Sequence, residues 1–224
     1  MPVLLAIETS GDACSVALAQ GARGEQVHAL HRVEARAHAR TLLPMIETLL
    51  AEAGQSMAAL DGIAFGRGPG SFTGLRIAAA VTQGLAWARD LPVYDCSSLA
   101  ALARTALVEV DRAAPSPAGV VVLVDARMGE LYWNAWRCEG DRIEALGEDR
   151  LDAPAHLAAP LAALPAGDWL FAGDGLAHEA LIVPAFERVA ARLPGTLPEA
   201  RQLLPEALAR AARGDGVSAD RAVP

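Results

Sequence analysis

The chain has 224 residues, 53% of them hydrophobic and only 4% aromatic, which predicts a soluble protein whose core is built from Ala, Leu and Val. The formal net charge is −8 and all 19 basic residues are Arg. The lack of Lys excludes a P-loop and Schiff-base chemistry, and the acidic balance argues against independent nucleic-acid binding. Three Cys and the absence of any apolar run of roughly 20 residues indicate a cytoplasmic protein without disulfides or membrane contact.

Three short β-like runs open the chain and predict a meander over residues 3–8, 14–20 and 26–33. The first run lacks a basic flank and meets Glu8 at once, so it is interpreted as a strand and not as a signal peptide. A helix is predicted over 41–53. Pro44 is tolerated in its first turn, and Gly54 ends it.

The next elements alternate between strand and helix. Strands are predicted over 60–66 and 91–95, each followed by a helix, over 71–88 with Ser71 as N-cap and from a Ser97 cap to about 110. A Pro-containing loop over 112–119, strands over 120–125 and 130–137, and a Pro- and Ala-rich remainder follow. This order predicts an α/β protein of two lobes, residues 1–112 and a smaller lobe of 113–224 that includes a C-terminal helix.

The segment GRGPGSFTGLRIA, residues 66–78, is the most informative stretch. A strand that enters a glycine-rich turn and then a helix offers backbone N–H groups and the positive end of a helix dipole to an anion. The segment matches neither the Walker pattern nor G-x-G-x-x-G, and the same residues also make a good structural turn, which the spacing favours. The candidate anion or nucleotide contacts are Thr9, Ser10, Gly68, Gly70, Ser71 and Arg76.

The helices predicted over 41–53 and 71–88 are apolar on more than one face. One face of each helix covers its own sheet, and the other face contacts either the second lobe or the helices of a partner. Both readings stay open from the pattern alone. The candidate partner-contacting residues, among which the small ones permit close approach, are Leu42, Met45, Ile46, Leu49, Phe72, Leu75, Ala79, Thr82 and Ala86.

Other candidate groups favour ordinary structural roles. His28 and His31 point to opposite faces of a strand, so a metal cluster that includes His38 is not expected. Glu8 and Asp12 flank a turn where a phosphotransferase would hold Mg²⁺, although a turn-forming Asp is the commoner explanation. Asp125 and Arg127 are interpreted as a salt bridge at a hairpin.

Four motifs occur together and in order: AIETSGDACSVAL, GRGPGSFTGLRIA, LPVYDCSSLAAL and VDARMGELYW. In this respect the chain resembles the bacterial TsaB family, also called YeaZ, from its start to about residue 136. Beyond that point the resemblance thins to residues 172–175 and a final helix around 205–213.

The resemblance implies an actin-like ATPase fold of the sugar-kinase and heat-shock type, in two lobes with the second reduced. It implies an accessory subunit, without catalytic residues or metal of its own, of the machinery that makes N6-threonylcarbamoyladenosine in tRNAs reading codons that begin with A. The implied partners are TsaD, which transfers the group, and the ATPase TsaE. TsaD would bind through first-lobe helices, and the chain alone would form a homodimer. No cofactor is expected in isolation, and ATP or ADP only within the complex.

Two departures from the family patterns bear on this reading. The paired His ligands of TsaD correspond here to Ser98 and Leu102, which form no metal-ligand pair. The usual Tyr-Leu-Arg terminus of the family is also absent after residue 224. Two alternative functions remain: an ATP-dependent phosphotransferase of the same fold, and a protease directed at TsaD, for which no nucleophile or metal site is apparent.

Overall fold

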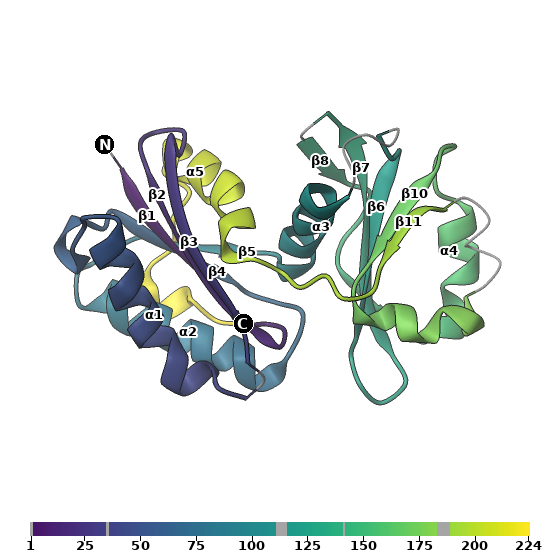
Figure 1. Cartoon of the computed structure of the whole chain (residues 1–224), viewed down its shortest axis with the longest axis horizontal. Helices are drawn as coiled ribbons and strands as arrows, with labels where there is room; N and C mark the ends of the chain where they lie inside the picture. The colour runs from purple at the N-terminus through teal and green to yellow at the C-terminus, as the bar shows by residue number, and fades with distance from the viewer. Residues whose placement is uncertain (1, 35, 111–115, 141, 183–188) are drawn as a thin grey trace. The chain divides into compact units, whose positions relative to one another are not determined.

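The computed structural model describes residues 2–34, 36–110, 116–140, 142–182 and 189–224 (Figure 1). The chain divides into two compact units, the first comprising residues 1–101 and 198–224 and the second 102–197. The expected boundary at residue 112 lies outside the described residues, as does part of the expected 112–119 loop. The C-terminal segment belongs to the first unit, whereas the sequence pattern placed it in the second lobe.

The first unit is built on a five-stranded sheet in the order β3-β2-β1-β4-β5. The pairs β1–β2 and β2–β3 are antiparallel, as the meander predicted, and β1–β4 and β4–β5 are parallel. The strands are β1 (Val3–Glu8), β2 (Ala13–Gln20), β3 (Gln26–Val33), β4 (Gly62–Gly66) and β5 (Val93–Cys96), each within two residues of its predicted limits.

Two helices cover one face of this sheet and a third lies on the other (Figure 1). α1 (His38–Glu52) has buried residues at helical spacing, and Gly54, at φ +63°, lies just beyond its end. α2 (Phe72–Trp87) begins after Ser71, whose side chain accepts a hydrogen bond from the Gly74 N–H and so confirms the predicted cap. α5 (Leu204–Arg213) packs on the opposite face.

Long-range contacts hold the C-terminal segment to the first sheet. Arg210 of α5 donates to the Asp95 carbonyl at 2.6 Å and to its carboxylate at 3.0 Å. Val217 forms a β-bridge with Val93, and the Gln83 side chain donates to the Ala222 carbonyl at 2.9 Å. These contacts explain why the last residues belong to the first unit.

The second unit repeats the topology of the first. Its sheet has the order β11-β10-β6-β7-β8, with antiparallel β6–β7–β8 pairing and parallel β6–β10–β11 pairing. The strands are β6 (Gly119–Asp125), β7 (Leu131–Glu139), β8 (Arg142–Ala145), β9 (Arg150–Asp152), which pairs with β7, β10 (Trp169–Ala172) and β11 (Val189–Leu193), and the helices are α3 (Ser98–Glu109), which begins in the first unit, and α4 (Ala158–Ala162). The expected two-lobed α/β fold of actin-like type is confirmed.

No helix among the described residues is both long and apolar enough to cross a bilayer.

Candidate functional site

Two of the sequence motifs meet at the carboxyl ends of β1 and β4. From β1 the chain turns toward β2 on one side, and from β4 it continues toward β5 on the other, which makes this edge a topological switch point of the sheet. The glycine turn, residues 66–70, lies beside the segment that follows β1, because the Ser71 N–H donates to the Ser10 carbonyl at 2.7 Å. We call Glu8, Thr9, Ser10, Ser98 and the glycine turn the Glu8 cluster.

The carboxylate of Glu8 lies at the centre of the Glu8 cluster and is only 1% exposed. Its Oε1 accepts from the Ser10 N–H at 2.6 Å, and its Oε2 accepts from the Ser98 hydroxyl at 2.8 Å. Burial raises the pKa of Glu8 above its ordinary value of 4.5, and the hydrogen bonds from Ser10, Ser98 and Thr9 oppose this shift. The group therefore ties the end of β1 to the start of α3.

The glycines of the turn lie against this cluster with no room for a side chain. A Cβ at Gly66 would lie 2.0 Å from Glu8 Oε2, and one at Gly70 would lie 2.6 Å from the Ser10 carbonyl oxygen. In the first turn of α2, a Cβ at Gly74 would lie 1.9 Å from the Thr9 carbonyl oxygen. The glycines thus permit the close approach of the chain's own segments.

The candidate anion contacts divide into buried and exposed groups. Thr9 and Ser10 are buried, and the Thr9 hydroxyl donates to the Gly74 carbonyl at 2.8 Å. Gly68 is buried as well, with its N–H directed to the Ser98 hydroxyl at 3.2 Å. Ser71 and Arg76 are exposed, and the Arg76 guanidinium stacks 3.7 Å from the centre of the Phe72 ring. Because the side chain of Glu8 and the backbone of Ser10 occupy this turn, the geometry favours its structural reading.

The predicted outward orientation of the small residues on α2 is wrong. Ala79, Thr82 and Ala86 are buried, although the Thr82 hydroxyl has no hydrogen-bond partner among the described residues. The small side chains let α2 pack closely within its own unit. The predicted contact residues of α1, namely Leu42, Met45, Ile46 and Leu49, are likewise buried in this core.

The outward face of α2 carries a different set of residues. Phe72 is 68% exposed and Trp87 is 76% exposed, at the two ends of the helix. Together with residues spaced by three or four they form what we call the α2 stripe, which consists of Phe72, Arg76, Ala80, Gly84 and Trp87. Of the predicted contact residues, Phe72 belongs to this stripe and Leu75 is half-buried beside it.

The remaining candidate residues of the first unit do not converge. His38 is buried, with Nε2 3.1 Å from the Gly11 carbonyl oxygen and 3.2 Å from that of Ala13, whereas His31 is exposed. Asp12 is exposed while Glu8 is buried. Among the described residues, no group of three or more His, Cys, Asp or Glu side chains is arranged to hold a metal ion. Of the two positions aligned with the TsaD ligands, Ser98 is bonded to Glu8 and Leu102 is buried.

The second unit has a counterpart of the Glu8 cluster at the ends of β6 and β10. Asp125 Oδ1 accepts from the Arg127 N–H at 2.7 Å, and the predicted salt bridge between these residues is confirmed at 3.6 Å. The Asp125 N–H donates to Asp174 Oδ1 at 2.9 Å. Arg127 and Met128, at φ +63° and +58°, form the tip of the β6–β7 hairpin, where Met128 is 98% exposed.

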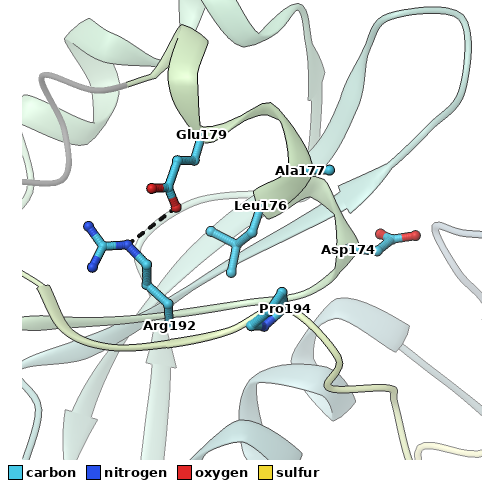
Figure 2. Close-up of a pocket in the computed structure, with 6 residues that line it drawn as sticks. All are labelled: Asp174, Leu176, Ala177, Glu179, Arg192 and Pro194. Carbon is cyan, nitrogen blue, oxygen red and sulfur yellow. Dashed lines mark ion pairs between the residues drawn. The ribbon is translucent and has the colours of Figure 1, made fainter.

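A hollow of about 370 Å³ lies beside Asp174, near the end of β11 (Figure 2). Leu176 points into it, and the Arg192 guanidinium pairs with the Glu179 carboxylate at 3.3 Å across one side. Because the charged groups of the wall already form this ion pair, the hollow offers little unbalanced charge to a ligand.

Two partners in these clusters have no local signal in the sequence. Ser98 lies 90 residues from Glu8, and Asp174 lies 49 residues from Asp125. Each follows a parallel strand that neighbours the strand of its partner or lies one strand further along the sheet. The predicted strand order, with a polar residue directly after each strand, was the signal that could have indicated both pairs.

Comparisons with known proteins agree with one another. A family model described as TsaD, tRNA N6-adenosine threonylcarbamoyltransferase, matches residues 30–218. The tRNA threonylcarbamoyladenosine biosynthesis protein TsaB of Escherichia coli is 32% identical over 99% of this chain and 92% of its own length. The TsaB protein of Haemophilus influenzae is 47% identical over 131 residues, a match that covers 58% of this chain and only 52% of that protein.

A solved structure extends the agreement to the whole fold. The structure of YeaZ from Pseudomonas aeruginosa has a TM-score of 0.87 and 41% identity, and the match covers all of this chain and 99% of that one. With a family model that matches most of the chain and a relative that matches nearly all of it, the chain belongs to the TsaB family, within the wider group that the TsaD model describes.

Proposed function

We propose that this protein acts in the biosynthesis of threonylcarbamoyladenosine in tRNA, as an accessory subunit that binds and activates a TsaD protein. The observation that carries the proposal is the match to the Escherichia coli TsaB protein over 99% of the chain. The Glu8 cluster supports an accessory role over the alternative of a phosphotransferase. The switch point of the first sheet, where such an enzyme would hold a phosphate, is occupied by the chain's own buried carboxylate.

The surface proposed for TsaD is the α2 stripe, with the neighbouring exposed residues of α1. Large exposed aromatic side chains are typical of binding energy concentrated in a few residues, and both Phe72 and Trp87 have this character. Between them Ala80 and Gly84 are exposed, and a Cβ at Gly84 would have nothing within 4 Å. A partner helix can therefore approach closely between the two aromatic residues.

Reconstitution tests the activity. Purified TsaD and TsaE from the same organism, threonylcarbamoyl-AMP and unmodified tRNA are incubated with and without this protein, and the modified nucleoside is measured. We expect multiple-turnover modification only when the protein is present. Equal modification without it would contradict the proposed activation, and proteolysis of TsaD during the incubation would favour the protease alternative.

A charge placed on the stripe tests the surface. Ala80→Arg puts a guanidinium where a partner helix must approach, so we expect loss of TsaD binding in size-exclusion chromatography with light scattering, together with loss of the proposed homodimer. Ala209→Arg makes the same change at an exposed position of α5, on the opposite face of the sheet, and is the matched control. If both variants bind TsaD like the wild type, the stripe is not the contact surface.

A further inference from the structure

The outer edge of the first sheet is a long strand with an open side. Among the described residues, β3 pairs with β2 alone, in unbroken register from Ala13 opposite Val33 to Gln20 opposite Gln26. Most of β3 is exposed, including Val27 at 37% and Val33 at 66%. An unbulged edge of this kind presents a row of backbone donors and acceptors to any further strand.

A hollow of about 250 Å³ opens where the end of β3 meets α1. Its walls come from two sources, with Arg32 and Glu34 at the strand end and one face of α1 opposite them. The α1 residues are Arg40, Thr41, Pro44, Met45 and Thr48, which are spaced by one, three, one and three positions. A strand added to β3 would direct every second side chain toward the sheet face that α1 covers.

The polar groups of this hollow are unequally satisfied. Arg40 forms an ion pair with Glu34, and the hydroxyls of Thr41 and Thr48 donate to carbonyl oxygens of α1. By contrast, the Arg32 guanidinium has neither a hydrogen bond nor an ion pair to any residue that the structure describes. The hollow thus offers one free cationic donor beside hydroxyl oxygens that are able to accept.

This combination fits a peptide better than a compact phosphate. A phosphate would meet the Glu34 carboxylate and two hydroxyls whose protons are already donated. A peptide strand supplies backbone N–H donors, backbone acceptors and a carboxylate in one ligand.

The local charge specifies the character of such a strand. Between residues 28 and 40 the chain has Arg32, Arg36 and Arg40 against Glu34, although the whole chain has a net charge of −8. No acidic residue lies in the first turn of α1 and no side chain caps its start, so the positive end of the helix dipole adds to this local field. The patch therefore attracts an acidic segment despite the acidity of the protein.

We propose that the open edge of β3 and this hollow bind an extended acidic segment of a partner protein, which adds a strand to β3 and places a carboxylate on Arg32. This surface is separate from the α2 stripe, so the inference stands independently of TsaD binding.

Nuclear magnetic resonance of the ¹⁵N-labelled full chain tests the proposal. The probe is an eight-residue peptide that alternates glutamate with valine and threonine. One control peptide has lysine in place of glutamate, and another has N-methylated alternate residues, which keep the charge but block strand pairing. We expect saturable shifts of amides in β3 and at the start of α1 with the first peptide, and at least about tenfold weaker binding of both controls.

Variants test the role of the free guanidinium. Arg32→Glu is expected to weaken binding of the acidic peptide by about tenfold or more, whereas Arg142→Glu, the same change on β8 in the second unit, should leave it unchanged. Amide spectra of each variant establish that it is folded.

Several results would overturn the proposal. They are the absence of saturable shifts, equal binding of the lysine peptide, equal binding of the N-methylated peptide, and equal binding to the Arg32→Glu variant. A tRNA anticodon stem-loop is titrated in parallel. If the RNA shifts the β3 amides and the acidic peptide does not, the surface recognises phosphate and the proposal is wrong.

Discussion

The ends of β1 and β6 carry the same local contact in opposite surroundings. In each case a carboxylate at the strand end accepts from the N–H two residues on, at 2.6 Å for Glu8 and Ser10 and at 2.7 Å for Asp125 and Arg127. Each strand also occupies the same place in its sheet, between an antiparallel and a parallel neighbour. The two units therefore repeat a contact as well as a topology.

Burial distinguishes these two strand ends. Glu8 is 1% exposed, bonded to Ser98 and enclosed by the glycine turn, whereas the side chain of Asp125 is 23% exposed and that of its partner Arg127 is 76% exposed. The same turn contact is thus part of the packed interior in the first unit and part of the surface in the second. The difference teaches that the motif around Glu8 serves packing here, while the Asp125 hairpin is available for contacts with other molecules.

The largest expected effect is at Gly74. Gly74→Val would place a Cβ 1.9 Å from the Thr9 carbonyl oxygen, which is backbone and cannot rotate away. We expect a loss of more than about 4 kcal/mol in the free energy of unfolding, or failure to fold. Gly84→Ala is the matched control in the same helix, and should stabilise by about 0.5–1 kcal/mol because its Cβ enters open space.

Urea unfolding of the soluble variants and expression yield in cells check both changes. Wild-type stability in Gly74→Val would show that the contact between α2 and the segment after β1 is loose, and the contrast between the two strand ends would then lose its main support.

The next effect compares the two carboxylates directly. Glu8→Ala leaves the Ser10 N–H and the Ser98 hydroxyl without their buried acceptor, so we expect a cost of about 2–4 kcal/mol. Asp125→Ala removes a contact that water can replace, and should cost less than about 1 kcal/mol. Equal changes in the urea midpoint for the two variants would contradict the distinction drawn from burial.

The charge of Glu8 predicts a dependence of stability on pH. Burial raises its pKa in the folded chain, so the folded state binds this proton more tightly than the unfolded state does. The contribution of Glu8 is fully present below pH 4.5 and is lost as the pH rises through the higher folded-state value. Glu8→Gln stays neutral, so its free energy of unfolding relative to wild type should increase as the pH rises above 4.5.

Parallel stability curves for wild type and Glu8→Gln would show that the buried carboxyl is not linked to folding. A constant offset between the curves has no bearing on this test, because the amide changes its hydrogen bonds with Ser98 equally at every pH.

The sequence predicted the strands and helices of the first unit well, since local patterns determine them. The apolar run after residue 2, the Ser71 cap and the Gly54 stop each depend on residues within one element. The outward face of α2 was not predictable in this way, because a helix that is apolar nearly all round has no periodicity to indicate its buried side. Only the tertiary packing shows that Ala79 and Ala86 face inward and Ala80 faces outward.

Contacts between distant segments were the second gap. The bridge of Val217 to Val93 and the hydrogen bonds of Arg210 to Asp95 return the C-terminus to the first sheet. Neither residue pair has a spacing or residue type that indicates the other. The sequence order alone therefore placed the final helix with its neighbours in the chain, in the second lobe.

The smallest expected effect is at the tip of the β6–β7 hairpin. Met128 adopts a left-handed conformation at φ +58° with its side chain 98% exposed, so it has backbone strain and almost no packing to lose. Met128→Asn should raise the free energy of unfolding by less than about 1 kcal/mol, because Asn is tolerated in this conformation far better than an unbranched apolar residue. Thermal unfolding at fixed pH, beside Met45→Asn in the buried face of α1, measures the contrast. A destabilisation at Met128 comparable to that at Met45 would mean that the tip is held by packing, and the second strand end would then resemble the first.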